Sequence, residues 1–93
     1  MIKSFKDKVT EQIFIGKAPI RIPVEISRRA LRRMIDINNA ESIMDLRIPP
    51  SNRLEQLKGK RTKQYSIRIN DQYRICFIWK DGAAYDVEFV DYH

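Results

Sequence analysis

The sequence has few of the residues that build cross-linked or metal-dependent structures. Among its 93 residues are one cysteine, Cys76, and one histidine, His93. A disulfide within the chain is therefore excluded, and a structural zinc site, which takes several Cys and His ligands, is not expected. Glycine-rich phosphate loops are absent, and no apolar run reaches the ~20 residues of a membrane-spanning helix. We therefore expect no metal, no cofactor and no membrane association, and the lone cysteine indicates a cytoplasmic protein.

Length and composition indicate one small globular domain over residues 1–93. Hydrophobic residues make up 43% of the chain, which is enough for a single core and argues against long-range disorder. The first twelve residues contain no apolar segment typical of a secretory signal, so none is expected.

Positive charge is in excess and unevenly distributed. Eighteen Lys and Arg residues against twelve Asp and Glu give a net charge of +6. Residues 21–33 hold five arginines and one acid, and residues 53–74 hold seven bases and two acids. A small domain this basic suits a polyanion or an acidic partner protein. A well-solvated surface is the simpler alternative, and a nucleic-acid footprint is the more specific interpretation.

The first half of the chain is predicted to be helical. Asp7 can cap a short helix that ends at Gly16. The clearest helix covers residues 23–38, since Pro23 is tolerated in a first turn and apolar residues then recur near the 3.6-residue period. Basic side chains gather on the other side of this helix; they are Arg28, Arg29, Arg32 and Arg33.

From Tyr65 the apolar period changes to two, which indicates strands. Strands over 65–69 and 73–79 are separated by an Asn-Asp-Gln turn, and Asp81-Gly82 predicts a tight hairpin into a last strand. Alternation places Tyr85, Val87 and Phe89 on one face of that strand. The predicted fold class is α+β, a small antiparallel sheet of three to four strands in a C-terminal meander, packed against N-terminal helices.

Chemistry-bearing side chains gather at the end of the last strand. Asp91, Tyr92 and His93 follow one another there. Imidazole titrates near pH ~6.5, so it can donate or accept a proton under physiological conditions. Hairpin geometry should pair Arg74 close to this strand end, and Lys58 lies on the approach to the first strand of the meander. A guanidinium beside an imidazole and a phenol can hold a phosphodiester.

These residues suit RNA cleavage without a metal. The 2′-hydroxyl of the substrate attacks the adjacent phosphorus, a base takes its proton, and an acid protonates the leaving 5′ oxygen. His93 can act as acid or base, Asp91 can orient or deprotonate, and Tyr92 can stack on a base. Arg74 and Lys58 can stabilise the charge on the phosphate.

Purely structural roles are the alternatives for the same residues. His93 can be a frayed terminal residue, and Lys58 can be a solvated surface lysine. Arg74 can instead form a salt bridge with Glu88 or Asp91.

The sequence resembles the HigB toxins, the plasmid-maintenance killer proteins of the RelE/ParE superfamily. The similarity lies in residues 64–79, in 84–93 with their terminal Val-Asp-Tyr-His, in 52–59 and in 1–5. It implies a RelE/ParE-like fold and a ribosome-dependent endoribonuclease that enters the ribosomal A site and cuts mRNA during translation. It also implies neutralisation by a HigA-like helix-turn-helix antitoxin, with operator DNA contacted only through that antitoxin.

The resemblance also assigns candidate site residues. The positions that match the family's active site are Lys58, Arg74, Asp91, Tyr92 and His93. Arg68 is a further RNA-binding candidate, although alternation from Arg74 does not fix its face. Some members have a histidine where this chain has Glu55, so Glu55 is an alternative base here, or that role is absent.

The family's basic surfaces contact ribosomal RNA. In this chain the residues that suit such contacts are Arg28, Arg29, Arg32, Arg33, Lys60, Arg61 and Lys63. The same bases could instead meet acidic residues of the antitoxin.

Two other functions remain open. The first is a ParE-like poison of DNA gyrase that inhibits by binding alone, although a pure binder has no need of a terminal acid–base group. The second is a non-catalytic RNA-binding or transcriptional accessory module, which the basic charge fits equally well.

Overall fold

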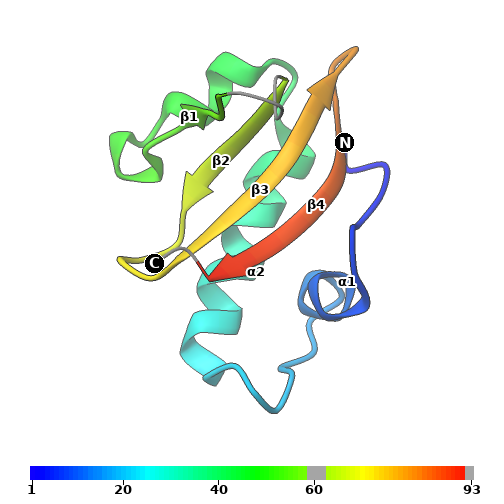
Figure 1. The fold of residues 1–93 in the computed structure, drawn as a ribbon, viewed down its shortest axis with the longest axis vertical. Coiled ribbons are helices and arrows are strands. Elements are labelled where there is room, and N and C mark those ends of the chain that lie inside the picture. The colour runs from blue at the N-terminus through cyan, green and yellow to red at the C-terminus, as the bar shows by residue number, and fades with distance from the viewer. Residues whose placement is uncertain (59–62, 92–93) are drawn as a thin grey trace.

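The computed structural model describes residues 1–58 and 63–91, which form a layer of helices against one β-sheet (Figure 1). The helices are α1 (Lys8–Phe14), α2 (Val24–Asn39) and the short 3-10 helices η1 (Ile43–Arg47) and η2 (Pro50–Asn52). The strands are β1 (Glu55–Gln56), β2 (Gln64–Arg68), β3 (Tyr73–Lys80) and β4 (Ala83–Asp91). All neighbouring strands pair antiparallel in the order β1-β2-β3-β4. The predicted α+β class is confirmed, with four strands in the meander.

Local sequence signals determine the ends of the two α-helices, α1 and α2. The Asp7 carboxylate accepts a hydrogen bond from the Thr10 backbone N–H at 2.8 Å, so it caps α1 as predicted. Gly16 follows the end of α1 with φ of +93°, a conformation that glycine adopts without strain. Pro23 is the N-cap of α2, which therefore begins one residue later than predicted, at Val24.

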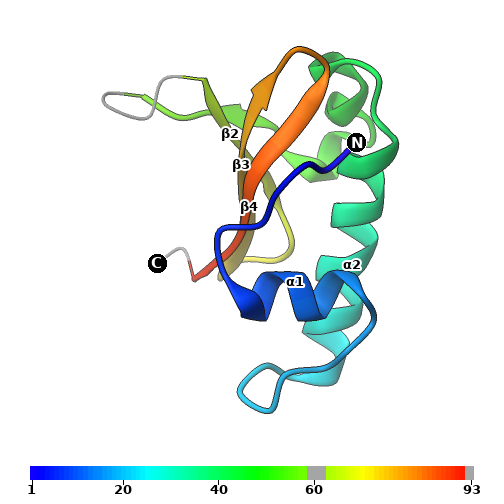
Figure 2. The same cartoon turned by 90° about the vertical axis from the view of Figure 1, so that its right-hand side faces the viewer.

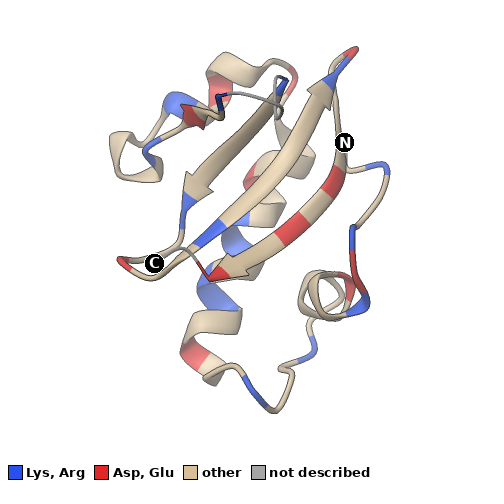
Figure 3. Ribbon diagram, viewed as in Figure 1, with Lys and Arg blue, Asp and Glu red and all other residues tan. Residues whose placement is uncertain are grey.

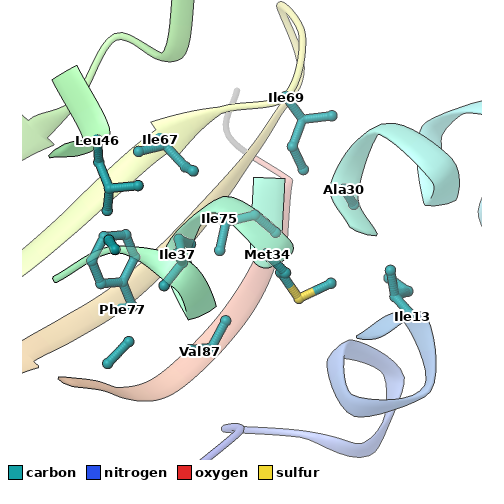
Figure 4. Packing of buried hydrophobic residues seen from close by; sticks show 12 residues of the cluster. Ile13, Ala30, Met34, Ile37, Leu46, Ile67, Ile69, Ile75, Phe77 and Val87 are labelled. Atoms are coloured by element: carbon teal, nitrogen blue, oxygen red, sulfur yellow. The ribbon is translucent and has the colours of Figure 1, made fainter. Parts of the chain in front are cut away.

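One face of α2 closes the hydrophobic core. α2 runs along one face of the sheet, and α1 packs against α2 and β4 (Figure 2). Met34 and Ile37 of α2 are fully buried and lie over Ile75 and Val87 of the sheet (Figure 4). We call the face of the sheet opposite to α2 the outer face. Among the helices in the described ranges, none is long and apolar enough to cross a bilayer.

A tight hairpin joins β3 to β4. Asp81 and Gly82 have φ of +50° and +76°, which is the backbone that the predicted Asp-Gly turn requires. The Ala84 and Val87 carbonyl groups on the far edge of β4 accept hydrogen bonds from the N-terminal segment, which runs parallel to β4. The edge of the sheet is therefore partly covered.

A β-bulge in β4 overturns one expectation about its faces. Asp86 has φ of +52°, and the register between β3 and β4 shifts beside it. Tyr85 consequently pairs with Ile78 on the outer face, whereas Val87 is buried in the core. The prediction that Tyr85, Val87 and Phe89 share one face is wrong, because a bulge inserts one residue that simple alternation does not include.

The β3–β4 turn gives a direct test of this backbone. Gly82→Ala should lower the free energy of unfolding by about 1 kcal/mol, because an L-residue is strained at positive φ. An added methyl group meets only an ordinary contact, 3.8 Å from the Glu41 carbonyl oxygen, so strain rather than collision is the cause. Asp81→Asn, which also tolerates positive φ, should be nearly neutral. Urea unfolding of both variants measures the difference, and equal stability of Gly82→Ala and wild type would contradict the assigned turn.

Candidate active site

A polar cleft of about 230 Å³ lies where β2 ends and β3 begins. It is built by the loop after η2, by β1 and by the β2–β3 hairpin, and its lining residues are Arg53, Glu55, Arg68, Asn70, Asp71 and Arg74. Three arginines and two acids leave the lining with one net positive charge. Figure 3 shows basic positions at the end of β2 and near the start of β3.

Two of the cleft arginines face each other directly. Arg68 pairs with Arg74 in the β2–β3 ladder, so both side chains lie on the outer face of the sheet. This settles the face of Arg68, which alternation alone left open. Like charges directly opposite each other are destabilising in a sheet. An ion pair between Arg68 and Asp71, and the Glu55 carboxylate 4.0 Å from Arg74 Nη1, offset that repulsion.

The Arg74 guanidinium is held firmly by protein oxygens. The residue is only 7% exposed. Its Nε donates to Ser66 Oγ at 2.8 Å, and its Nη2 donates to the carbonyl oxygens of Arg53 at 2.6 Å and Ser66 at 3.3 Å. Because these oxygens come from β2 and from the loop before β1, Arg74 ties both segments to β3. These hydrogen bonds fix the orientation of the guanidinium.

The carboxylate beside Arg74 differs from the one anticipated. The described ion pair of Arg74 is with Glu55, which the short strand β1 brings next to Ser66 of β2. Glu88 instead pairs with Lys6, at 3.7 Å. The sequence alternatives for the partner of Arg74 were Glu88 and Asp91, whereas the ion pair seen here joins Arg74 to an acid from the opposite edge of the sheet.

The β2–β3 turn places the second acid. The Asn70 side-chain oxygen accepts hydrogen bonds from the backbone N–H groups of Gln72 and Tyr73, both at 2.8 Å. This Asx geometry closes the predicted Asn-Asp-Gln turn and leaves Asp71 beside Arg68. The residues that were predicted as a turn therefore also line part of the cleft.

β4 ends at the end of the sheet that carries the cleft. Arg74 pairs with Val90, as the hairpin geometry predicted, and Asp91 pairs with Tyr73. By alternation Asp91 then belongs to the face opposite Arg74, and its carboxylate accepts a hydrogen bond from Gln72 Nε2 at 3.3 Å. The sheet therefore brings Asp91 near Arg74 along the strand without placing the two on one face. Tyr92 and His93 lie outside the described residues.

Lys58 is separate from the cleft. It is exposed just beyond β1, where Leu57 N–H donates to the Gln64 carbonyl oxygen. Gln64 pairs with Ile78, four residues from Arg74, which corresponds to roughly 14 Å of strand. Lys58 is therefore not among the residues that line the cleft. Lys63, which directly precedes β2, is also exposed. The other two basic candidates of this part of the chain, Lys60 and Arg61, lie outside the described residues.

A second basic surface lies on α2. Its arginine row, which we define as Arg28, Arg29, Arg32 and Arg33, lines a hollow of about 380 Å³ together with Glu25. Arg33 is the inner member of the row, and its Nε donates to the Arg68 carbonyl oxygen at 3.1 Å. Through Arg33 the arginine row thus meets the sheet at the strand end that carries the cleft.

Sequence reasoning missed part of the lining. Asn70 and Asp71 were recognised only as turn residues, although their position between two arginine-bearing strands was an available signal. Arg53 gave no such signal, because its left-handed backbone, with φ of +46°, and its carbonyl contact with Arg74 depend on tertiary packing. Within residues 1–58 and 63–91, no cluster of three His, Cys, Asp or Glu residues is arranged to hold a metal ion.

The fold, an antiparallel meander packed against helices, is consistent with the RelE-like toxin class. Residues 3–93 match the family model of the RelE-like toxin of type II toxin–antitoxin system HigB, so this chain belongs to the HigB family. It is 40% identical to Toxin HigB-1 of Vibrio cholerae serotype O1, over 100% of this chain and 98% of that protein. It is 33% identical to Endoribonuclease HigB of Proteus vulgaris over the full length of both chains.

The two acids of the cleft should weaken the binding of a polyanion. Glu55→Gln should tighten binding of a short 2′-O-methyl RNA by about twofold to threefold at low salt, because one carboxylate no longer competes for Arg74. Fluorescence anisotropy measures the change, and Glu41→Gln, an exposed acid outside the cleft, is the matched control. Equal affinities of Glu55→Gln and the control would show that the RNA does not enter this cleft.

Proposed function

We propose that this toxin is a ribosome-dependent endoribonuclease that cleaves mRNA during translation. The observation that carries the proposal is the facing pair Arg68 and Arg74, two guanidiniums whose repulsion an anionic ligand would relieve. Membership of the HigB family supports the proposal, as does the name of the Proteus vulgaris relative, an endoribonuclease. A phosphodiester is an anion that such a pair can grip through parallel N–H···O bonds.

The proposed reaction needs no metal ion. The 2′-oxygen of one nucleotide forms a bond to the adjacent phosphorus, and the bond from phosphorus to the 5′ oxygen of the next nucleotide breaks. A base removes the 2′ proton, and an acid gives a proton to the 5′ oxygen. The products are a 2′,3′-cyclic phosphate and a free 5′-hydroxyl. Arg74 and Arg68 stabilise the additional negative charge on the phosphate oxygens in the transition state.

Proton transfer is assigned to the residues at the end of β4. His93 serves as acid or base, because an imidazole changes protonation state near neutral pH. Asp91 is assigned to orienting the reacting groups or removing a proton, which requires its carboxylate to reach around the strand end from the face opposite Arg74. Tyr92 is assigned to stacking on a base. Glu55 is the alternative base, since its carboxylate is exposed in the cleft beside Arg74.

Lys58 is assigned, together with Arg74, to stabilising the charge on the reacting phosphate. The surfaces assigned to ribosomal RNA are the arginine row on α2 and the basic loop Lys60, Arg61 and Lys63. Guanidinium and ammonium groups can neutralise backbone phosphates without reading sequence.

The proposed partners follow from membership of a type II toxin–antitoxin family. A HigA-like antitoxin with a helix-turn-helix domain neutralises the toxin, and operator DNA is contacted only through that antitoxin. The ribosomal A site and its mRNA are the target, which requires the toxin to act in the cytoplasm.

His93→Gln tests the catalytic assignment. It should abolish cleavage of translated mRNA, because glutamine can accept the same hydrogen bonds but cannot exchange a proton with the substrate. Mapping of mRNA 5′ ends after brief expression measures cleavage, and circular dichroism checks that the fold is kept. Cleavage at the wild-type rate by this variant would show that the acid–base residue lies elsewhere. Cleavage of gyrase-held DNA with intact mRNA would instead favour the ParE-like function.

The arginine row makes a separate prediction. Arg28→Gln with Arg32→Gln should reduce the slope of log affinity against log salt by about 1.4, because two phosphate contacts of about 0.7 each are lost. Binding of a single-stranded RNA at several salt concentrations measures the slope. A variant with the same loss of charge, Lys3→Gln with Lys80→Gln, is the control because both lysines are exposed away from the row. Equal slopes for the two double variants would remove the row from the RNA-binding surface.

A further inference from the structure

An apolar hollow that the proposed reaction does not use lies between α1 and the connection that leads from α1 to α2. Its volume is about 440 Å³. It is formed by α1 and by the connection 15–23, and its lining residues are Val9, Gln12, Lys17, Ala18, Pro19, Ile20, Arg21 and Ile22. Most of the lining is therefore aliphatic, in contrast to the charged cleft on the sheet.

The hollow exposes side chains that a protein normally buries. Ile20 is fully exposed, and Ile15, Val9 and Val24 nearby in the chain are each more than two-fifths exposed. Single exposed apolar residues are normal, whereas several on one surface around a hollow are typical of an interaction site. Water is a poor partner for this surface, so covering it with an apolar side chain is favourable.

The charged residues that line the hollow are basic. Lys17 and Arg21 are the charged residues of its lining, and the adjoining hollow at the start of α2 adds Arg28. Neither lining contains an acidic residue. An apolar floor with a basic rim is complementary to a segment that presents aliphatic side chains flanked by Asp or Glu.

The hollow and the cleft have no lining residue in common. The lining of the hollow comes from α1 and the connection to α2, a part of the chain that runs below the sheet in Figures 1 and 2, whereas the lining of the cleft comes from the sheet and the loop before β1. A partner seated in the hollow would therefore not have to contact Arg68 or Arg74. Loss of binding in the hollow and loss of cleavage can thus be separated by mutation.

We infer that this hollow is the docking surface for an acidic, amphipathic segment of the antitoxin. The inference rests on the proposed function only in requiring an antitoxin, which membership of a type II toxin–antitoxin family implies. Aliphatic side chains of that segment fill the space around Ile20, and its carboxylates pair with Lys17 and Arg21. The antitoxin is therefore recognised by the apolar and basic side chains of the hollow and not by the active-site residues.

Ile20→Asp is the sharpest test, because it puts a carboxylate on the apolar surface without disturbing a buried residue. The probe is the protein encoded by the reading frame next to the gene for this chain, purified separately. Isothermal titration calorimetry should show a rise in Kd of at least about tenfold, and Ile20→Leu should bind like wild type. Ile48→Asp is the matched control, because Ile48 is also largely exposed but lies outside the hollow.

A charge-reversal variant tests the rim. Lys17→Glu with Arg21→Glu should weaken binding at low salt and converge toward wild type at high salt. Lys3→Glu with Lys80→Glu, the same change elsewhere, should have a smaller effect. The Ile20→Asp variant should keep wild-type mRNA cleavage and escape neutralisation by the antitoxin.

Several results would overturn the inference. Binding of Ile20→Asp within twofold of wild type, with cleavage intact, would reject the docking surface and leave the proposed function standing. Absence of binding by wild type would contradict both the docking surface and the antitoxin half of the proposed function. If Ile20→Asp loses binding to phosphatidylglycerol vesicles but keeps antitoxin affinity, the hollow is a lipid-binding surface instead.

Discussion

Two arginines that face each other across β2 and β3 impose the main constraint on this molecule. Arg68 and Arg74 would repel each other on a bare sheet, so the surrounding segments are arranged to supply oxygens. The short strand β1 contributes Glu55, the hairpin turn contributes Asp71, and the loop after η2 contributes the Arg53 carbonyl group. The result is a cleft whose positive charge is only partly neutralised, which is the condition for binding an anion reversibly.

Helix α2 serves both the core and the basic surface, because the helical period separates its two faces. Ala30, Met34 and Ile37 are fully buried, while Arg28, Arg29 and Arg32 of the arginine row are exposed. Arg33 connects the two, since it reaches the backbone of β2 at Arg68. The helix that stabilises the fold thereby extends the basic surface from the cleft.

Local features of the structure were predictable, and the failures have a common cause. The Asp7 cap, the Asp81-Gly82 turn and the pairing of Arg74 near the end of β4 depend on short-range rules, and all three were predicted correctly. The face of Tyr85 was predicted wrongly because the bulge at Asp86 depends on how two strands fit the core. The face of Arg68 was left open by alternation for a similar reason, since it depends on the register between β2 and β3.

The sequence by itself determined the α+β class, the excess of positive charge, the amphipathic helix and the order of the strands, because each follows from composition or from a short repeat. Only the tertiary structure decided which charges meet. It brought Arg53 and Glu55 to Arg74, and it left an apolar hollow beside α1. Such contacts join residues that are distant in the chain, and their geometry depends on strand register and packing, which local patterns do not encode.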